Sequence, residues 1–484
     1  MFRKFVLIAV SIFMLAAAVD AQVLKTTVLS AGLSGNNRYP GIGENDRGER
    51  LAIWRWSNNG MAYSWYRDGK WTKPARIPNQ VRTEGDYLGS DIVADSTGRF
   101  HAVWELMDRD CYYASFKDGA WTKVATIPVP GKYEGFQIGL DIRSNDELVL
   151  TWTGKPTRIM KDCFLGFKNK NETNFKRFMN VTDDKESSSS SMLAVDEADN
   201  IWLTWKGEEF GGEEILLSCV IKLDKDNHII KSSFKQLSGE QAGWSFLQWI
   251  ANNKKGKTMA IWWKNPGYYA RLHDDATDKW STIHTLPIKT DRKPDFSMWS
   301  KVVAHNDDFW VLMKDGKYIP WLIKYDGVKG EWGSARQLTY DAVFYYDIYP
   351  GYDNILIAWC TRKDPSQVEF ATVPVPPMIR VKSVGGVVPQ TGVERSFFRS
   401  YPFNKLSWQP NSFNVENNIN VTYYNVYRRV QGSGDFPETP IMSRIPVATT
   451  TYSDLTIDPQ LTYEYYVTCI ALINDKEVES PITE

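Results

Sequence analysis

Acidic residues that recur beside glycines are the first feature of this sequence that could bind a ligand or do chemistry. Glu84-Gly85 precedes Gly89-Ser90-Asp91-Ile92, and Glu134-Gly135 precedes Gly139-Leu140-Asp141-Ile142 at the same distance. Asp347-Ile348 repeats the end of this motif much later in the chain. A carboxylate at such a position accepts hydrogen bonds, either from a ligand hydroxyl or from the backbone of a neighbouring strand.

Large aromatic side chains near the first strands of the repeats could join these carboxylates in space. Aromatic residues make up 14% of the chain, with 20 Trp and 24 Tyr, which is more than a core requires. Flat rings stack on sugar faces while carboxylates accept hydrogen bonds from sugar hydroxyls, so the combination suits a glycan. We therefore predict a ligand-binding set made of Asp91, Asp141, Asp347, Glu84, Glu134, Trp244, Trp249, Trp299 and Tyr346.

The same residues also have a purely structural interpretation. An Asp before a strand caps a turn or bonds a neighbouring sheet, and repeated aromatic rings fill the space between sheets. Side chains alternate between the two faces of a strand, and the sequence does not show which of them face inward. Both interpretations stay open at the level of sequence.

A short apolar strand ending in Trp recurs about every fifty residues and organises the first part of the chain. Within one interval, residues 88–94, 100–104, 111–116 and 121–127 read as four strands joined by polar turns. Such a sheet cannot bury both faces alone, so radial stacking is favoured and predicts a closed β-propeller. The seven copies are Ala52-Ile53-Trp54, Ala102-Val103-Trp104, Leu150-Thr151-Trp152, Leu203-Thr204-Trp205, Ala260-Ile261-Trp262, Val311-Leu312-Met313 and Ile357-Ala358-Trp359.

The seventh repeat supplies only three strands, at residues 345–349, 355–359 and 368–373. Residues 23–29 are similar in pattern to the fourth strand at 121–127, so we expect them to complete the last sheet. This pairing joins the two ends of the domain and covers an otherwise exposed sheet edge.

The repeat, with its Asp68-Gly69 and Asp118-Gly119 turns before a Trp strand, resembles the sialidase-like family of bacterial repeat propellers over roughly residues 23–375. The family's Ser-x-Asp-x-Gly-x-x-Trp box is intact nowhere in this chain. The resemblance implies that an enzyme of this type would use a Tyr nucleophile, an acid and substrate-clamping arginines. Residues of these types near the strand starts are Arg38, Tyr39, Glu84, Glu134 and Tyr346.

Catalysis, metals and cofactors find little support in the sequence. Arg38, Arg82 and Arg292 are not an aligned set of three, so we name no catalytic residue and favour binding over enzymatic activity. The five histidines lack metal spacing, no CxxC pair is present, and no nucleotide-binding fingerprint occurs, so we expect no metal and no cofactor. The five cysteines are an odd number and are expected to be buried small side chains in strands.

After Pro374-Val375-Pro376-Pro377, a stiff linker, the fifty-residue rhythm stops. Leu406-Ser407-Trp408 reads as a strand with a core Trp, and Leu461-Thr462-Tyr463 reads as a tyrosine corner before an alternating strand. This segment resembles a fibronectin type III domain. The predicted fold class is therefore all-β, with a seven-bladed β-propeller at residues 22–375 and an immunoglobulin-like β-sandwich of the fibronectin type III kind at 376–484.

The first 21 residues read as a secretory signal peptide. Arg3 and Lys4 precede an apolar stretch at residues 5–18, and Val19-Asp20-Ala21 supplies small residues before a cut at Gln22. We therefore expect a secreted, periplasmic or extracellular protein with no membrane insertion after cleavage. The formal net charge of -1, without a basic block, argues against nucleic acid as a partner.

We expect a monomer that binds an extracellular glycan or protein through the loop face of the propeller without turnover. Two alternatives remain, a sialidase-like carbohydrate-active enzyme and an extracellular scaffold or adhesion protein. A tight set of acid, Tyr and Arg side chains would favour the enzyme, and a broad apolar patch would favour the scaffold.

Overall fold

The computed structural model is an all-β structure in which α2 (Ser412–Glu416) is the one helix among the described residues. The structure describes residues 24–57, 60–80, 87–106, 110–130, 132–133, 138–155, 161–183, 187–208, 214–223, 229–232, 234–238, 245–289, 300–378, 383–395, 400–416, 419–434, 436–437, 439–473, 476–480 and 482. The chain divides into two compact units after Pro377, two residues beyond the predicted boundary. Within the described residues, no helix has the length and apolar character needed to cross a bilayer.

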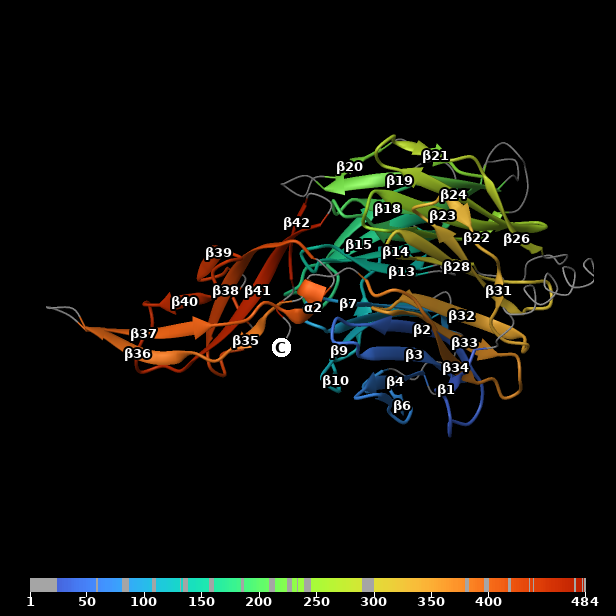
Figure 1. Ribbon diagram of the computed structural model, residues 1–484. Helices are drawn as coiled ribbons and strands as arrows, with labels where there is room; N and C mark the ends of the chain where they lie inside the picture. Colours follow the sequence, from blue (N-terminus) through green and yellow to red (C-terminus); the bar gives the residue numbers. More distant parts are fainter. Residues whose placement is uncertain are drawn as a thin grey trace, which may run out of the picture. The chain divides into compact units, whose positions relative to one another are not determined.

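The described residues of unit 1 form seven antiparallel sheets, numbered here in chain order (Figure 1). Sheet 1 is β2 (Asn37–Glu44), β3 (Arg50–Trp56), β4 (Met61–Arg67), β5 (Lys70–Trp71) and β6 (Ala75–Arg76). Sheet 2 is β7 (Tyr87–Ala94), β8 (Phe100–Leu106), β9 (Asp110–Lys117), β10 (Ala120–Trp121) and β11 (Ala125–Ile127). Sheet 3 is β12 (Lys132–Tyr133), β13 (Gly139–Ile142), β14 (Leu148–Lys155), β15 (Asp162–Lys168) and β16 (Arg177–Asn180).

The remaining sheets of unit 1 repeat this order. Sheet 4 is β17 (Ser187–Val195), β18 (Ile201–Glu208), β19 (Glu214–Leu223), β20 (Ile229–Lys231) and β21 (Lys235–Gln236). Sheet 5 is β22 (Ser245–Asn252), β23 (Lys257–Lys264), β24 (Gly267–Asp274), β25 (Lys279–Trp280) and β26 (His284–Lys289). Sheet 6 is β27 (Lys301–His305), β28 (Asp308–Lys314), β29 (Pro320–Asp326), β30 (Glu331–Trp332) and β31 (Arg336–Gln337). Sheet 7 is β32 (Val343–Pro350), β33 (Asn354–Thr361), β34 (Val368–Pro374) and β1 (Thr27–Val28).

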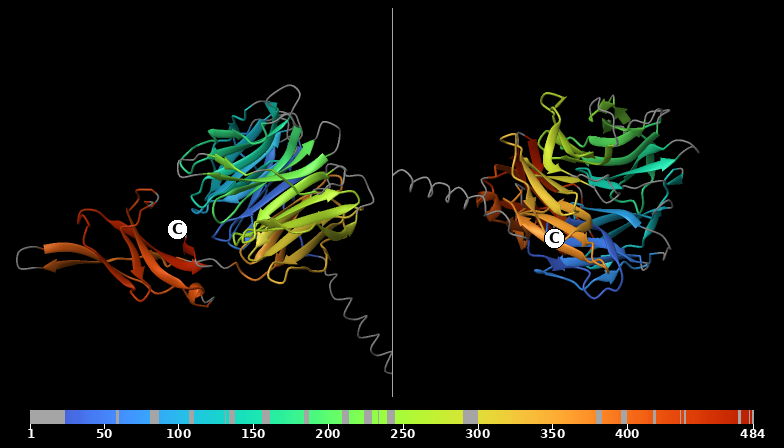
Figure 2. Two further views of the ribbon diagram at one scale, coloured as in Figure 1. Left: turned by 90° about the horizontal axis from the view of Figure 1, so that it is seen from above. Right: turned by 90° about the vertical axis from the view of Figure 1, so that its right-hand side faces the viewer.

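The sheets form a closed ring of the β-propeller type. The first strands β2, β7, β13, β17, β22, β27 and β32 contact one another in that order, and β32 contacts β2 (Figure 2). In the last sheet, β1 pairs with β34 through Thr27 opposite Phe370 and Val28 opposite Glu369. A closing strand is therefore present, but it spans Thr27–Val28 and is shorter than the predicted residues 23–29, of which Val23 lies outside the described residues.

The recurrent Trp supplies the packing between sheets. Trp54, Trp104, Trp152, Trp205, Trp262 and Trp359 are all buried, and Met313 occupies the same place in sheet 6. Burial of a side chain of this size contributes on the order of 3 kcal/mol of hydrophobic stabilisation. All five cysteines are buried free thiols, as the sequence predicts.

In unit 2 the residues that the structure describes form two antiparallel sheets. One is β35 (Gly385–Val387), β41 (Tyr463–Ile473), β38 (Val421–Val430), β39 (Met442–Pro446) and β42 (Lys476–Glu479). The other is β36 (Gln390–Arg395), β37 (Ser400–Ser407) and β40 (Thr451–Asp454). In the core Trp408 packs edge-on against Tyr424 at 5.5 Å between ring centroids. The Asp458 backbone N–H donates to the Tyr463 hydroxyl at 3.0 Å, which is the bond that a tyrosine corner requires.

Candidate functional site

Two of the three predicted aspartates join neighbouring sheets. One carboxylate oxygen of Asp91 in β7 accepts the Leu140 N–H of sheet 3 at 2.9 Å. One oxygen of Asp141 in β13 accepts the Val195 N–H of sheet 4 at 2.7 Å. The second oxygen of each accepts the N–H of the residue that follows it, so both oxygens are already engaged. These carboxylates hold sheets together, which is the structural interpretation of the motif.

The third aspartate, Asp347 in β32, closes the ring in the same way. One of its oxygens accepts the Ile42 N–H of sheet 1 at 2.8 Å, and the other lies 2.5 Å from Lys301 Nζ. Lys301 also lies over the indole of Trp249, 4.1 Å from the ring centroid, which is a cation–π distance. Both partners of the ion pair are buried.

These residues belong to one layer of the first strands, called the central layer below. Each sheet contributes one residue of its first strand to this layer. That residue pairs with the second-strand residue that directly precedes the recurrent Trp, or Met313 in sheet 6. Burial raises the pKa of Asp91 to about 7, Lys301 lowers it, and Asp347 raises it further, so these three groups interact electrostatically. The central layer consists of Gly41, Asp91, Gly139, Met192, Trp249, Lys301 and Asp347.

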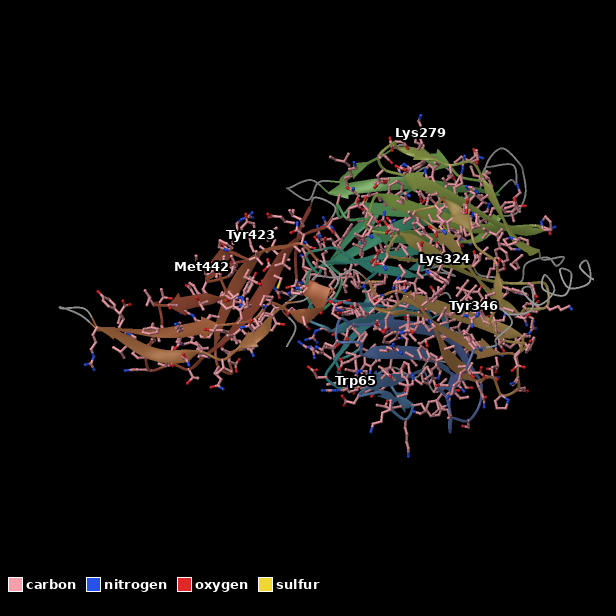
Figure 3. The ribbon with its side chains drawn as sticks, viewed as in Figure 1. Trp65, Lys279, Lys324, Tyr346, Tyr423 and Met442 are labelled. Atoms are coloured by element: carbon pink, nitrogen blue, oxygen red, sulfur yellow. The ribbon has the colours of Figure 1, made fainter. Side chains whose placement is uncertain are left out.

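Tyr346, another predicted ligand contact, lies in the core instead. It is buried within sheet 7 (Figure 3), and its hydroxyl donates to the Leu312 carbonyl of sheet 6 at 3.4 Å. Burial raises the pKa of Tyr346 well above its ordinary value. The other predicted contacts, Glu84, Glu134, Trp244 and Trp299, lie outside the described residues, as do Arg82 and Arg292.

A second layer consists of the residues that directly follow the recurrent Trp, or Met313 in sheet 6, and it includes buried charged side chains. It lies at the mouth of the ring, defined here as the end where first strands begin and second strands end. Glu105 and Lys314 have no solvent exposure, and Lys206 is also buried. This mouth layer consists of Arg55, Glu105, Thr153, Lys206, Trp263, Lys314 and Cys360.

Glu105 is unusual because its carboxyl group has no hydrogen-bond partner among the described residues. It is fully buried, and neither carboxylate oxygen has a hydrogen-bond partner in the part of the chain that the structure describes. Burial raises the pKa of Glu105 to about 8, so the side chain is largely protonated at neutral pH. Gly89 makes room for it, since a Cβ there would lie 3.0 Å from a Glu105 oxygen.

Sheets 1, 6 and 7 bring cations and aromatic rings together at the mouth. The Arg362 guanidinium lies 3.9 Å from the Tyr318 ring centroid and 4.6 Å from that of Phe344. The Arg38 guanidinium lies 5.2 Å from the same Phe344 ring. With their neighbours they form what is called the cation–aromatic cluster below, made of Arg38, Tyr39, Lys314, Tyr318, Phe344, Tyr345 and Arg362.

A backbone irregularity shapes this cluster. The β2–β3 register shifts between Arg38 and Gly41, and Tyr39 has a positive φ of 53°. Bulges redirect side chains and are frequent beside functional sites. Here the bulge places the Tyr39 ring 3.9 Å from the Tyr345 ring, and the two hydroxyls are hydrogen bonded at 2.9 Å.

Sequence reasoning had noted Arg38 and Tyr39 but missed Lys314, Tyr318, Phe344, Tyr345, Arg362 and Glu105. A usable signal exists, because a charged residue repeatedly follows the apolar Trp strand, as in Trp54-Arg55, Trp104-Glu105 and Trp205-Lys206. No group of three or more His, Cys, Asp or Glu side chains within the described ranges is arranged to hold a metal ion.

Neither the scan against protein-family models nor the search of curated proteins gives a match to this sequence. Solved structures of similar fold include a protein of unknown function from Dyadobacter fermentans, with 10% identity, a TM-score of 0.45 and coverage of 73% of this chain and 99% of that one. Another is a leech intramolecular trans-sialidase, with 10% identity, a TM-score of 0.41 and coverage of 73% of this chain and 70% of that one. A third is the Dos1 propeller, with 8% identity, a TM-score of 0.45 and coverage of 74% of this chain and 96% of that one. Similarity at this level does not indicate a function.

Proposed function

We propose that this chain is an exported protein, with a signal peptide, a seven-bladed β-propeller and a fibronectin type III domain, that binds an extracellular glycan without turnover. Seven sheets in a closed ring, with β1 completing the last one, support the propeller. Two packed sheets, the buried Trp408 and the Tyr463 hydroxyl bond support the second domain. The charged start and apolar stretch of residues 1–21 support export.

The cation–aromatic cluster is the observation that carries the binding proposal. Aromatic rings contribute flat apolar surfaces that suit sugar faces, and the hydrogen bond between the Tyr39 and Tyr345 hydroxyls holds two of these rings together. Phe344 and Tyr345 are only partly buried, so part of each ring is accessible. The cluster is built on the ends of strands, which hold it in one arrangement in the absence of ligand.

A glycan array probed with the mature protein tests this proposal. We expect saturable binding to a subset of glycans, with affinity reduced about tenfold or more by Phe344→Ala, because a stacking surface is lost. Tyr401→Ala in unit 2, an exposed aromatic residue, serves as the matched control and should bind as the wild type does. Release of free sugar from a bound glycan, or equal binding by Phe344→Ala, would contradict the proposal.

A further inference from the structure

We propose that Tyr39 and Tyr345 form an oxidative modification site, at which a one-electron oxidant couples the two phenol rings into a dityrosine bond between the first and last sheets of the ring. The oxidant is of the haem peroxidase class, with hydrogen peroxide as its co-reactant. The two residues are 306 positions apart in the chain, and ring closure brings them together. The modification requires no glycan and goes beyond the proposed function.

The two rings are arranged as coupling requires. Their centroids lie 3.9 Å apart with an angle of 35° between the ring planes, and the Tyr39 hydroxyl donates to the Tyr345 hydroxyl at 2.9 Å. Dityrosine is joined through the ring carbons next to the hydroxyls, so the product also has its two hydroxyls side by side. Because the reacting groups are already oriented in this way, coupling is an intramolecular step between positioned partners.

The backbone holds both rings in this arrangement. Tyr39 lies within the register shift of β2 and has a positive φ of 53°, and Tyr345 lies within the register shift of β32. The Tyr39 carbonyl accepts the Ser90 hydroxyl at 3.2 Å, and the Tyr345 N–H donates to Cys360 Sγ at 3.3 Å. Two anchored bulges therefore direct the two rings toward each other.

One ring of the pair is accessible to an oxidant. Tyr345 is only partly buried, whereas Tyr39 is buried. The oxidant removes one electron and the phenolic proton from Tyr345, and the resulting radical takes the hydrogen of the Tyr39 hydroxyl along their hydrogen bond. A second oxidation of Tyr345 then leaves a phenoxyl radical on each ring.

Coupling of the two radicals completes the reaction. One carbon–carbon bond forms between the ring carbons next to the hydroxyls, and each of these carbons passes its hydrogen to the adjacent oxygen. The pair has then lost two electrons and two protons, which reduce one hydrogen peroxide to two waters.

A tyrosine pair in unit 2 lacks this arrangement. Tyr463 and Tyr465 have ring centroids 6.4 Å apart. The Tyr463 hydroxyl accepts the Asp458 N–H, and the Tyr465 hydroxyl donates to Asp454. These hydroxyls are bonded to other groups, so the pair serves as an internal control within the same chain.

Coupling gives the ring a covalent closure. The closing strand β1 pairs with β34 through Thr27 and Val28 alone, and the five cysteines are free thiols. A bond between Tyr39 and Tyr345 spans 306 positions of the chain and reduces the conformational entropy of the unfolded state. Unit 1 is therefore expected to resist unfolding more strongly once the bond has formed.

Treatment of the mature chain with a haem peroxidase and hydrogen peroxide, followed by peptide mass spectrometry, tests the modification site. We expect a linked peptide pair that contains Tyr39 and Tyr345 and has lost two hydrogen atoms. This pair should be about tenfold or more as abundant as any link between Tyr463 and Tyr465. Tyr39→Phe and Tyr345→Phe each keep the ring and should abolish the pair, while Tyr401→Phe, at an exposed position of unit 2, should retain it.

The folded geometry and the covalent closure have separate readouts. In urea that unfolds the chain the yield of the pair should fall about tenfold or more, with oxidation of Tyr401 as evidence that the peroxidase still acts. The treated wild type should have a higher urea midpoint than the untreated chain, whereas treated Tyr345→Phe should not.

Two results would overturn the modification site. One is absence of the Tyr39–Tyr345 pair in a folded chain whose exposed Tyr401 is oxidised, and the other is an equal yield of the pair in urea. An unchanged urea midpoint of the linked chain would overturn the covalent closure. These measurements use no glycan, so their failure leaves the proposed function untouched.

Discussion

Glu105→Gln is expected to stabilise unit 1 by several kcal/mol at pH 9 and to change its stability little near pH 4.5. Glu105 is fully buried and both of its oxygens lack partners among the described residues. Burial raises the pKa of Glu105 from 4.5 to about 8. The neutral amide of Gln has nearly the same shape as the protonated acid but cannot ionise.

The direction of the pH dependence follows from the raised pKa. Below about pH 4.5 the Glu105 carboxyl group is protonated in both the folded and the unfolded chain, so its ionisation costs the folded state no stability. As the pH rises toward 8, the unfolded chain releases the proton while the folded chain retains it, and stability falls. The gap between the two pKa values corresponds to a loss on the order of 5 kcal/mol, complete above about pH 8.

Urea unfolding between pH 4.5 and 9, followed by Trp fluorescence, measures this effect. The signal reports unit 1, because Trp408 is the one Trp after residue 377. Glu331→Gln, at an exposed position, is the matched control and should retain the pH dependence of the wild type. If Glu105→Gln and the wild type lose stability in parallel as the pH rises, the prediction that Glu105 stays protonated in the folded chain is wrong.

The repeat architecture was accessible from sequence because the packing unit is local. Each Trp strand and its turns lie within fifty residues. The alternation of apolar strand segments and polar turns therefore shows directly which residues form one sheet. Asp91 illustrates the limit of this reasoning. Its motif is visible in the sequence, but whether its carboxylate meets a ligand or the Leu140 N–H depends on the orientation of one strand against the next.

The cation–aromatic cluster illustrates a second limit. Arg38 and Arg362 meet at Phe344 because the ring closes, although more than 300 residues separate them in the chain. The position of Tyr39 depends further on a bulge with a positive φ, which an ordinary strand pattern does not predict. Contacts that depend on ring closure and on a local register shift are not encoded in any single repeat.

Asp347→Asn is expected to destabilise unit 1 by about 3–5 kcal/mol at pH 7, because it leaves the buried Lys301 ammonium without its carboxylate. The Asn side-chain oxygen can still accept the Ile42 N–H, so the loss reports mainly the missing charge. Asp341→Asn breaks the exposed pair with Lys363 and should cost no more than about 1 kcal/mol, which makes it the matched control. Urea midpoints from Trp fluorescence compare the two variants.

The double variant Lys301→Met with Asp347→Asn separates the charge from packing effects. Once both charges are gone no unpaired ammonium remains, so the double variant should recover part of the stability that Asp347→Asn loses. Asp91 provides a second readout, since Asp347 raises its pKa and Lys301 lowers it. We expect the pKa of Asp91 to fall in Asp347→Asn and to rise again in the double variant, as followed by carboxyl NMR. A double variant less stable than Asp347→Asn alone would show that Lys301 stabilises the ring through Trp249 rather than through Asp347.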